Sequence, residues 1–168
     1  MPASAEVDWT FGGAWPFQPR WFATPGGRMH YIDEGPRGGR PTVLVHGNPT
    51  WGFVYRAFVG PLAAAGYRVI VPDHLGFGRS DKPHDARLCT VSGHIERFDA
   101  LLESLDLHGA TVVPQDWGGP IGLSWAVAHP QRAERLFTPT PSPTAPHGRC
   151  RYLCHCSCSG HPAPARCW

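Results

Sequence analysis

Short apolar runs alternate with amphipathic stretches over the first 136 residues of the chain. Three of the runs are bounded by turn-forming residues, as is typical of strands buried on both faces: residues 42–46, 67–71 and 110–113. Three further stretches are predicted to be helical: residues 51–65, 90–107 and 118–129. A strand over residues 28–33, where apolar and polar side chains alternate, precedes them all.

This order of elements indicates the fold class. Strands that alternate with helices form right-handed βαβ units, which build a mostly parallel, doubly wound sheet. A further strand is expected to begin at residues 135–137, where the pattern stops. Residues 1–27 are rich in Trp, Phe, Pro and Gly and predict an extended lead-in. We therefore expect an α/β fold that is truncated near this strand.

The composition changes where the pattern stops. Residues 1–136 hold 12 basic and 13 acidic side chains, a formal charge of −1, whereas residues 137–168 hold three arginines and no acid. The second segment also carries five of the six cysteines and six of the 19 prolines. Such a low-complexity segment cannot build a core. We predict that residues 1–136 are the N-terminal part of one domain and that residues 137–168 form a disordered tail.

Charge and hydropathy exclude several functions. A net charge of +2 without a basic run argues against nucleic-acid or membrane-surface binding. No apolar run reaches the roughly 18–20 residues of a membrane helix, and residues 1–17 lack the regions of a signal peptide. The body has a single cysteine, Cys89, so a cytoplasmic protein is predicted. The tail's Cys-x-Cys-x-Cys spacing differs from that of structural zinc sites, so no metal site is assigned.

The segment after the strand at residues 110–113 carries the strongest chemical signal. One acidic residue, Asp116, is followed by Trp117 and by glycines that open a helix, which is the pattern of a nucleophile elbow. Pro114 departs from the usual glycine. A carboxylate can attack an sp3 carbon and form an ester, which water opens with the help of a general base, normally His. The alternative role for Asp116 is that of a helix N-cap.

A second candidate, Asn48, follows the strand at residues 42–46. The loops at the carboxyl ends of parallel strands lie together, so Asn48 is expected beside the elbow. Its amide and the Trp117 indole supply N–H donors that can hold a leaving halide, and the backbone N–H groups of both residues are candidates for an oxyanion site. Alternatively, Asn48 only forms a turn before Pro49, and Trp117 packs in the core.

Residues 15–136 resemble the N-terminal half of the haloalkane dehalogenases, a family of α/β-hydrolases. The resemblance rests on three motifs in the family's order and spacing: residues 45–51 (VHGNPTW), 71–83 (VPDHLGFGRSDKP) and 115–122 (QDWGGPIG). It implies an incomplete α/β-hydrolase fold, with a mostly parallel doubly wound sheet truncated near the family's sixth strand at residues 135–137. It also implies Asp116 as the nucleophile, and Asn48 with Trp117 as the halide-stabilising pair. It also implies a small halogenated alkane as the substrate, with no metal or organic cofactor.

The resemblance leaves two alternatives open. Epoxide hydrolases share the fold and the Asp-Trp-Gly-Gly elbow, although Asn48 favours a dehalogenase. The family's catalytic His and acid find no match here, so the chain as written is expected to be inactive, and a non-enzymatic relic of a frame-shifted gene is the second alternative. In that relic the strand at residues 110–113 would lose its neighbour and leave an edge prone to aggregation. None of the ten histidines is assigned as the base, and His46 and His74 are expected to shape their loops.

Overall fold

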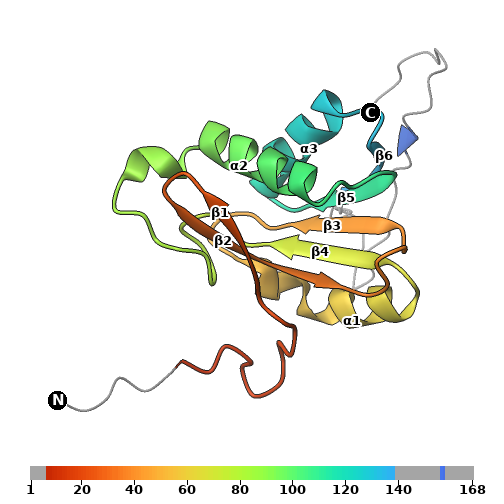
Figure 1. The fold of residues 1–168 in the computed structure, drawn as a ribbon, viewed down its shortest axis with the longest axis horizontal. Helices are drawn as coiled ribbons and strands as arrows, with labels where there is room; N and C mark the ends of the chain where they lie inside the picture. Colours follow the sequence, from red (N-terminus) through yellow and green to blue (C-terminus); the bar gives the residue numbers. More distant parts are fainter. Residues whose placement is uncertain (1–6, 139–155, 158–168) are drawn as a thin grey trace, which may run out of the picture.

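The computed structural model describes residues 7–138 and 156–157 of the 168-residue chain. Its centre is a seven-stranded sheet with the order β1-β2-β4-β3-β5-β6-β7 (Figure 1). The strands are β1 (Arg20–Thr24), β2 (Gly27–Glu34), β3 (Pro41–Val45), β4 (Arg68–Pro72), β5 (Ala110–Pro114), β6 (Ala133–Leu136) and β7 (Cys156–Ser157). The helices are η1 (Gly52–Tyr55), α1 (Arg56–Ala64), η2 (Ala86–Cys89), α2 (Val91–Ser104) and α3 (Gly118–Ala128), of which η1 and η2 are short 3-10 helices.

Strand direction changes across the sheet. β2 pairs antiparallel with β1 and β4, whereas β4, β3, β5 and β6 form a continuous parallel block. The mostly parallel α/β fold expected from the sequence is therefore confirmed. β3 lies between β4 and β5, so the chain passes outward from β3 to β4 and then returns across β3 to β5. The carboxyl ends of β3 and β5 thus meet at the switch point where open α/β sheets bind ligands.

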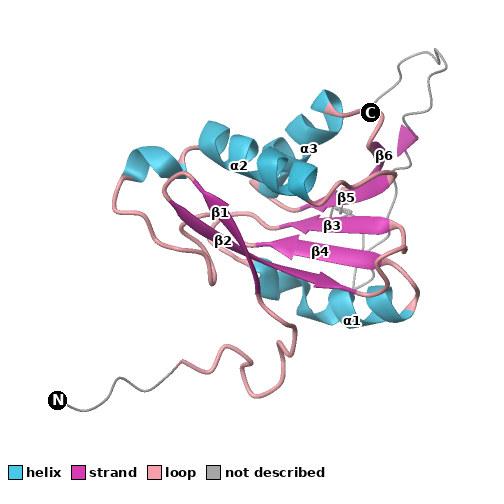
Figure 2. Ribbon diagram, in the orientation of Figure 1, coloured by secondary structure: helices cyan, strands magenta, loops and turns pink. Residues whose placement is uncertain are grey.

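Helices cover both faces of the sheet, with α1 on one face and α2 and α3 on the other (Figure 2). Alternate side chains of β3 serve the two faces, because successive side chains of a strand point to opposite sides. Val43 and Val45 belong to a core cluster with Phe98 of α2. Leu44 belongs to a second cluster with Val59 of α1. β3 is thus buried on both faces, as its apolar run predicts.

The predicted helix over residues 51–65 is divided in the structure. The chain first forms the tighter helix η1 and then α1, with the change at Tyr55. The Tyr55 hydroxyl donates to the carbonyl oxygen of Val45 at 2.9 Å and lies 3.2 Å from that of Val113. Tyr55 therefore fastens η1 to the carboxyl ends of β3 and β5, a contact that helical periodicity does not reveal.

Two elements, β1 and η2, are not predicted by the sequence pattern. β1 lies inside the predicted lead-in and is an edge strand that pairs with β2. Its side chains alternate between partly buried and exposed, and the exposed set includes the apolar Trp21, so apolar and polar positions do not separate. η2 is a single turn whose start is capped by the Asp85 carboxylate, which accepts the N–H of Arg87 at 3.0 Å. One turn is too short to show a period.

The strand before Asp116 keeps its neighbour. β6 pairs in parallel with β5, and the N–H of Phe137 donates to the carbonyl of Val112 at 2.8 Å. The expected open edge at residues 110–113 is therefore wrong, because residues 133–136 already complete a sixth strand. β7 pairs antiparallel with β6. Residues 139–155 and 158–168 lie outside the described part, so disorder there stays a prediction.

Candidate active site

Asp116 occupies a sharp turn between β5 and α3. Its φ of 53° lies in the left-handed region that side-chain-bearing residues avoid. Such a conformation costs about 1–3 kcal/mol and persists only where the surrounding contacts enforce it. The N–H of Gly118 donates to the carbonyl of Gln115 at 2.9 Å, and that of Gly119 to the carbonyl of Asp116 at 2.8 Å. This is the backbone geometry that the elbow pattern predicts.

Two glycines let the elbow pack closely against β3 and the loop that follows it. A Cβ atom at Gly118 would lie 2.2 Å from the carbonyl oxygen of Val45. One at Gly47 would lie 2.5 Å from both Cβ and Oδ1 of Asp116. These separations leave no room for a side chain, so both positions require glycine. Sequence reasoning missed Gly47, for which the only signal is its place beside Asn48 in the first motif.

Asn48 contacts Asp116 through its backbone. Its N–H donates to Oδ1 of Asp116 at 3.0 Å, between segments 68 positions apart in the sequence. Asn48 also lies in a tight turn, because the N–H of Thr50 donates to the carbonyl of Gly47 at 3.0 Å. The turn-forming role and the donor role of Asn48 are therefore compatible.

Trp117 stands at the start of α3, directly after Asp116. It has helical backbone angles and is 45% exposed, so it is not a core residue. No side chain caps this end of α3, and the Asp116 carboxylate instead accepts the Asn48 N–H. The N-cap alternative for Asp116 is thus not what the structure has. Asn48 and Asp116 are also exposed, so all three predicted site residues face outward at one edge of the sheet.

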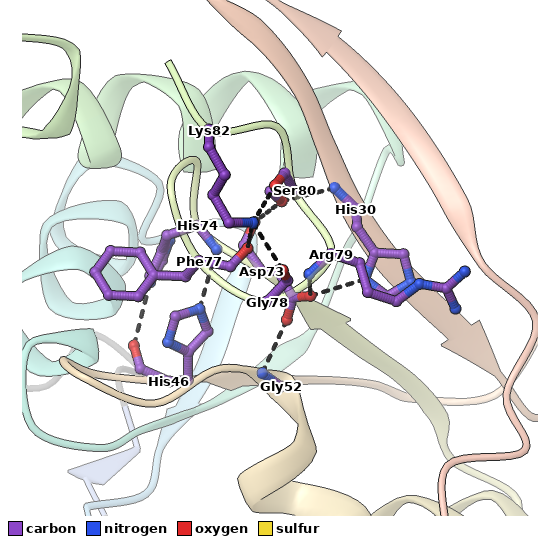
Figure 3. Close-up of polar contacts among 10 residues, drawn as sticks. All are labelled: His30, His46, Gly52, Asp73, His74, Phe77, Gly78, Arg79, Ser80 and Lys82. Carbon is purple, nitrogen blue, oxygen red and sulfur yellow. Dashed lines mark hydrogen bonds and ion pairs between the residues drawn. The ribbon is translucent and has the colours of Figure 1, made fainter. Parts of the chain in front are cut away.

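Three buried histidines lie behind the site. His46 stacks on His74 with ring centroids 4.4 Å apart, and His74 lies 5.2 Å from His94. His46 donates from Nδ1 to the carbonyl of Gly47. Its Nε2 accepts the His74 N–H (Figure 3). Burial lowers the pKa of His46, lowers that of His74 further, and brings that of His94 to about 4 with help from the nearby Arg97 charge. The stack is therefore uncharged at neutral pH and supports its loops, as expected.

Six of the seven histidines in the described part form a side-chain hydrogen bond, and none of these bonds is to Asp116. The contacts of these six are His30 to Asp73, His46 to Gly47, His74 to His46, His94 to Arg97, His108 to Asp106 and His129 to Asp99. None of these six contacts therefore identifies a histidine as the general base, which stays unassigned.

Residues 7–138 and 156–157 contain neither a metal-binding cluster nor a membrane-spanning helix. Within this part of the chain, no group of three His, Cys, Asp or Glu side chains is arranged to hold a metal ion. None of its helices has the length and hydropathy needed to cross a membrane. The Cys-rich spacing at residues 154–158 lies almost wholly outside the described part.

The chain matches known proteins over about three quarters of its length. Residues 41–152 match the family model described as the alpha/beta hydrolase fold. The chain belongs to the α/β-hydrolase family. This α/β-hydrolase is 50% identical over 132 residues to a haloalkane dehalogenase of Mycobacterium marinum, an alignment that covers 74% of this chain and 44% of that protein. It is 44% identical over 123 residues to a cis-3-alkyl-4-alkyloxetan-2-one decarboxylase of Shewanella oneidensis, covering 72% and 38%.

Solved structures give the same picture of this α/β-hydrolase. The haloalkane dehalogenase DpaA of Paraglaciecola agarilytica superposes with a TM-score of 0.69 at 40% identity, over 73% of this chain and 43% of that one. An epoxide hydrolase from an endophytic Streptomyces superposes with a TM-score of 0.63 at 35% identity, over 73% and 36%. The chain therefore spans less than half the length of each of these relatives, and its resemblance is to their N-terminal halves.

Proposed function

We propose that this chain carries the nucleophilic half of a haloalkane dehalogenase site. A carboxylate oxygen of Asp116 attacks the carbon that bears a halogen, the C–O ester bond forms, and the halide leaves with the electron pair of the C–X bond. The amide of Asn48 and the indole N–H of Trp117 stabilise the departing halide. The substrate class is a small halogenated alkane, and the reaction needs no metal or organic cofactor.

The contact between the Asn48 N–H and Oδ1 of Asp116, at 3.0 Å, carries the proposal. A donor that holds one oxygen fixes the plane of the carboxylate and directs the other oxygen, Oδ2, to the attack. After the attack, Oδ1 becomes the carbonyl oxygen of the ester. The same N–H then stabilises the negative charge that develops there when water adds.

The second half of the reaction needs a general base to activate water. Because the six histidines named above are bonded elsewhere in the described part, we propose that the chain as written forms the ester and does not release it. Each chain would then react once, with one substrate molecule, as a half-site rather than a turnover catalyst.

A cytoplasmic location is part of the proposal. The free thiol of Cys89 supports a reducing, cytoplasmic compartment.

The test is incubation of the purified chain with 1,2-dibromoethane, with intact mass and bromide release followed together. The tryptic segment between Arg97 and Arg132 contains Asp116 and no cysteine, so its modification is distinct from thiol alkylation. One adduct per chain on Asp116 is expected, and it should be absent from the Asp116→Asn variant. Asp106→Asn is the matched control, because Asp106 also has a positive φ, of 47°, but is bonded to His108.

Two results would contradict the proposal. Bromide released in large excess over protein would show a complete dehalogenase. An unmodified segment would show that Asp116 is not a nucleophile in this chain.

An epoxide hydrolase-type site is the second candidate, supported by the structural likeness to an epoxide hydrolase. The same carboxylate would open the ring of an epoxide, which leaves an alkoxide rather than a halide. Alkoxide departure requires a proton donor, whereas halide departure needs only N–H groups such as those of Asn48 and Trp117. Incubation with styrene oxide separates the two, because only an epoxide-type site would add the whole epoxide mass to Asp116.

A further inference from the structure

The carboxylate of Asp73, which follows β4, is fully buried and holds three donors (Figure 3). Its Oδ1 accepts the N–H of Gly52 at 2.8 Å. Its Oδ2 accepts the N–H of Arg79 at 2.9 Å and the Nδ1–H of His30 at 2.9 Å. A buried carboxylate is stable only when its lone pairs are satisfied in this way. Asp73 therefore ties together three segments that are distant in the sequence.

The backbone around Asp73 is fixed as well. The hydroxyl of Ser80 donates to the Asp73 carbonyl at 2.7 Å and accepts the N–H of His30 at 2.8 Å. The Lys82 ammonium closes the same loop by donating to the carbonyls of Gly78 and Ser80. A Cβ atom at Gly78 would lie 2.3 Å from Oδ2 of Asp73, so the loop is wrapped directly on the carboxylate. Both the carboxylate and the backbone of Asp73 are thus held in place at the carboxyl end of β4.

One of the three donors belongs to the loop that carries Asn48. Gly52 is the first residue of η1 and lies four positions after Asn48. A Cβ atom at Gly52 would lie 2.8 Å from Oδ1 of Asp73, so this approach is also close. On its other side, Asn48 donates its N–H to Asp116. The Asn48 turn, which spans residues 47–50, is therefore held by two carboxylates. Asp116 accepts the N–H of Asn48 itself, and Asp73 accepts the N–H of Gly52, which follows the turn.

We propose that Asp73 is a positioning residue of the site, which sets the place of the Asn48 turn against Asp116 through the N–H of Gly52. The inference rests on the proposed function, because it gives Asp73 a share in the alkylation of Asp116. Asp73 itself is buried and acts through the turn. The negative charge of Asp73 strengthens its hold on the turn, because both oxygens accept hydrogen bonds and charge-assisted hydrogen bonds are stronger and shorter than neutral ones.

The isosteric variant Asp73→Asn removes this double acceptor. An amide has one oxygen and one NH2 group, so whichever way it turns, NH2 faces either Gly52 or the pair formed by Arg79 and His30. In either orientation one set of donors loses its acceptor, so residue 73 no longer holds the N–H of Gly52 and the Arg79/His30 pair together. A displacement of about 1 Å of a positioning group can lower a rate on the order of 100-fold.

The experiment compares Asp73→Asn with Asp33→Asn at a temperature where both variants are folded. Asp33 is an equally suitable buried carboxylate, since it accepts two hydrogen bonds of 2.9 Å from Arg68 and lies on β2 away from the Asn48 turn. Amide hydrogen exchange over residues 47–53 reports the turn directly and does not depend on alkylation. The rate of Asp116 alkylation by 1,2-dibromoethane, separated into its maximum and its half-saturating concentration, reports the site.

Asp73→Asn is expected to accelerate exchange over residues 47–53 and to lower the maximum alkylation rate by roughly 10- to 100-fold. Asp33→Asn should change neither, even where it lowers the melting temperature equally. Equal effects in both variants, or unchanged exchange in Asp73→Asn, would overturn the inference. If the wild-type chain is not alkylated, the proposed function fails while the exchange comparison still decides the role of Asp73.

A milder variant keeps the test decisive if Asp73→Asn does not fold. Ser80→Ala leaves the carboxylate in place and removes the hydroxyl that holds the Asp73 carbonyl. It should accelerate exchange over residues 47–53 to a smaller extent. Exchange at the wild-type rate in a folded Ser80→Ala variant would count against the inference.

Discussion

A missing Cβ atom at Gly47 determines how closely the Asn48 turn approaches Asp116. Because a methyl group there would lie 2.5 Å from Cβ and Oδ1 of Asp116, the variant Gly47→Ala must push the two segments apart. We expect a loss of about 1–3 kcal/mol in the free energy of unfolding, the usual cost of overpacking. We also expect slower alkylation of Asp116. Urea unfolding and the alkylation rate measure the two effects.

The control for this substitution is Gly38→Ala. Gly38 is exposed and has no atom within 4 Å of the position that a Cβ would take. A surface substitution of this kind should change the free energy of unfolding by no more than about 0.5 kcal/mol. If Gly47→Ala were equally harmless, the close packing of the turn on Asp116 would not exist in solution.

At the scale of single residues, the sequence identifies which residue types are present but not which backbone contacts they make. Asp116, Asn48 and Trp117 were predicted from motifs, and the structure brings Asn48 and Asp116 together. The contact uses the backbone N–H of Asn48, which every residue except proline possesses, so the residue type cannot reveal it. The same holds for the Asp73 carboxylate, two of whose three donors are backbone N–H groups.

At the scale of elements, α2 offers the simplest test of a predicted boundary. The Thr90 hydroxyl accepts the N–H of Gly93 at 3.2 Å and satisfies one of the unpaired donors at the start of the helix. Thr90→Ala should therefore lower the free energy of unfolding by about 1 kcal/mol. Thr90→Ser retains the hydroxyl and should retain most of the stability, as measured by urea unfolding. Equal losses in both variants would exclude the cap as the cause.

Elements with a strong period were predictable, and those fixed by tertiary contacts were not. β3 and β4 are buried on both faces and β5 is buried on one face and half-buried on the other, and all three appear in the sequence as apolar runs. β1 lacks such a run because it is an edge strand with Trp21 among its exposed side chains. The division of residues 51–65 at Tyr55 follows from a hydroxyl contact across the fold, which a local pattern does not encode.

At the scale of the whole molecule, the stack of His46, His74 and His94 makes stability depend on pH. The pKa of His94 is about 4 and those of the other two are also lowered, whereas an unfolded histidine titrates near 6.5. Between about pH 6.5 and pH 4 the unfolded chain therefore binds protons that the folded chain excludes. The free energy of unfolding should fall as pH decreases through this window, by up to about 1.4 kcal/mol per pH unit for each such histidine.

Urea unfolding at about pH 7 and about pH 5 measures this dependence. His94→Gln should reduce the slope, because it removes one of the groups that the folded chain keeps neutral. His108→Gln, at an exposed position, should leave the slope unchanged. A slope that is the same in all three proteins would contradict the role of the stack.

The outer face of α3 should make the molecule self-associate. Leu123 and Val127 lie four positions apart on this helix, on one face, and are 47% and 71% exposed. Replacing both with Gln should reduce concentration-dependent association, measured by sedimentation velocity, with little change in melting temperature. Phe58→Gln alters an exposed apolar side chain of α1 on the other face of the sheet and should not reduce association. Unchanged association in the double variant would show that another surface is responsible.

The close approach of β3 and β5 has a consequence for the order of events during synthesis. The contacts that hold Asp116 come from Val45, Gly47, Asn48 and the first turn of α3, and Asp73 adds its anchor from the connection between them. All of these residues are translated before residue 123. A nascent chain that has cleared the ribosome through α3 therefore already possesses every group that shapes the carboxylate. Its capacity to be alkylated would be acquired co-translationally, ahead of whatever sequence follows.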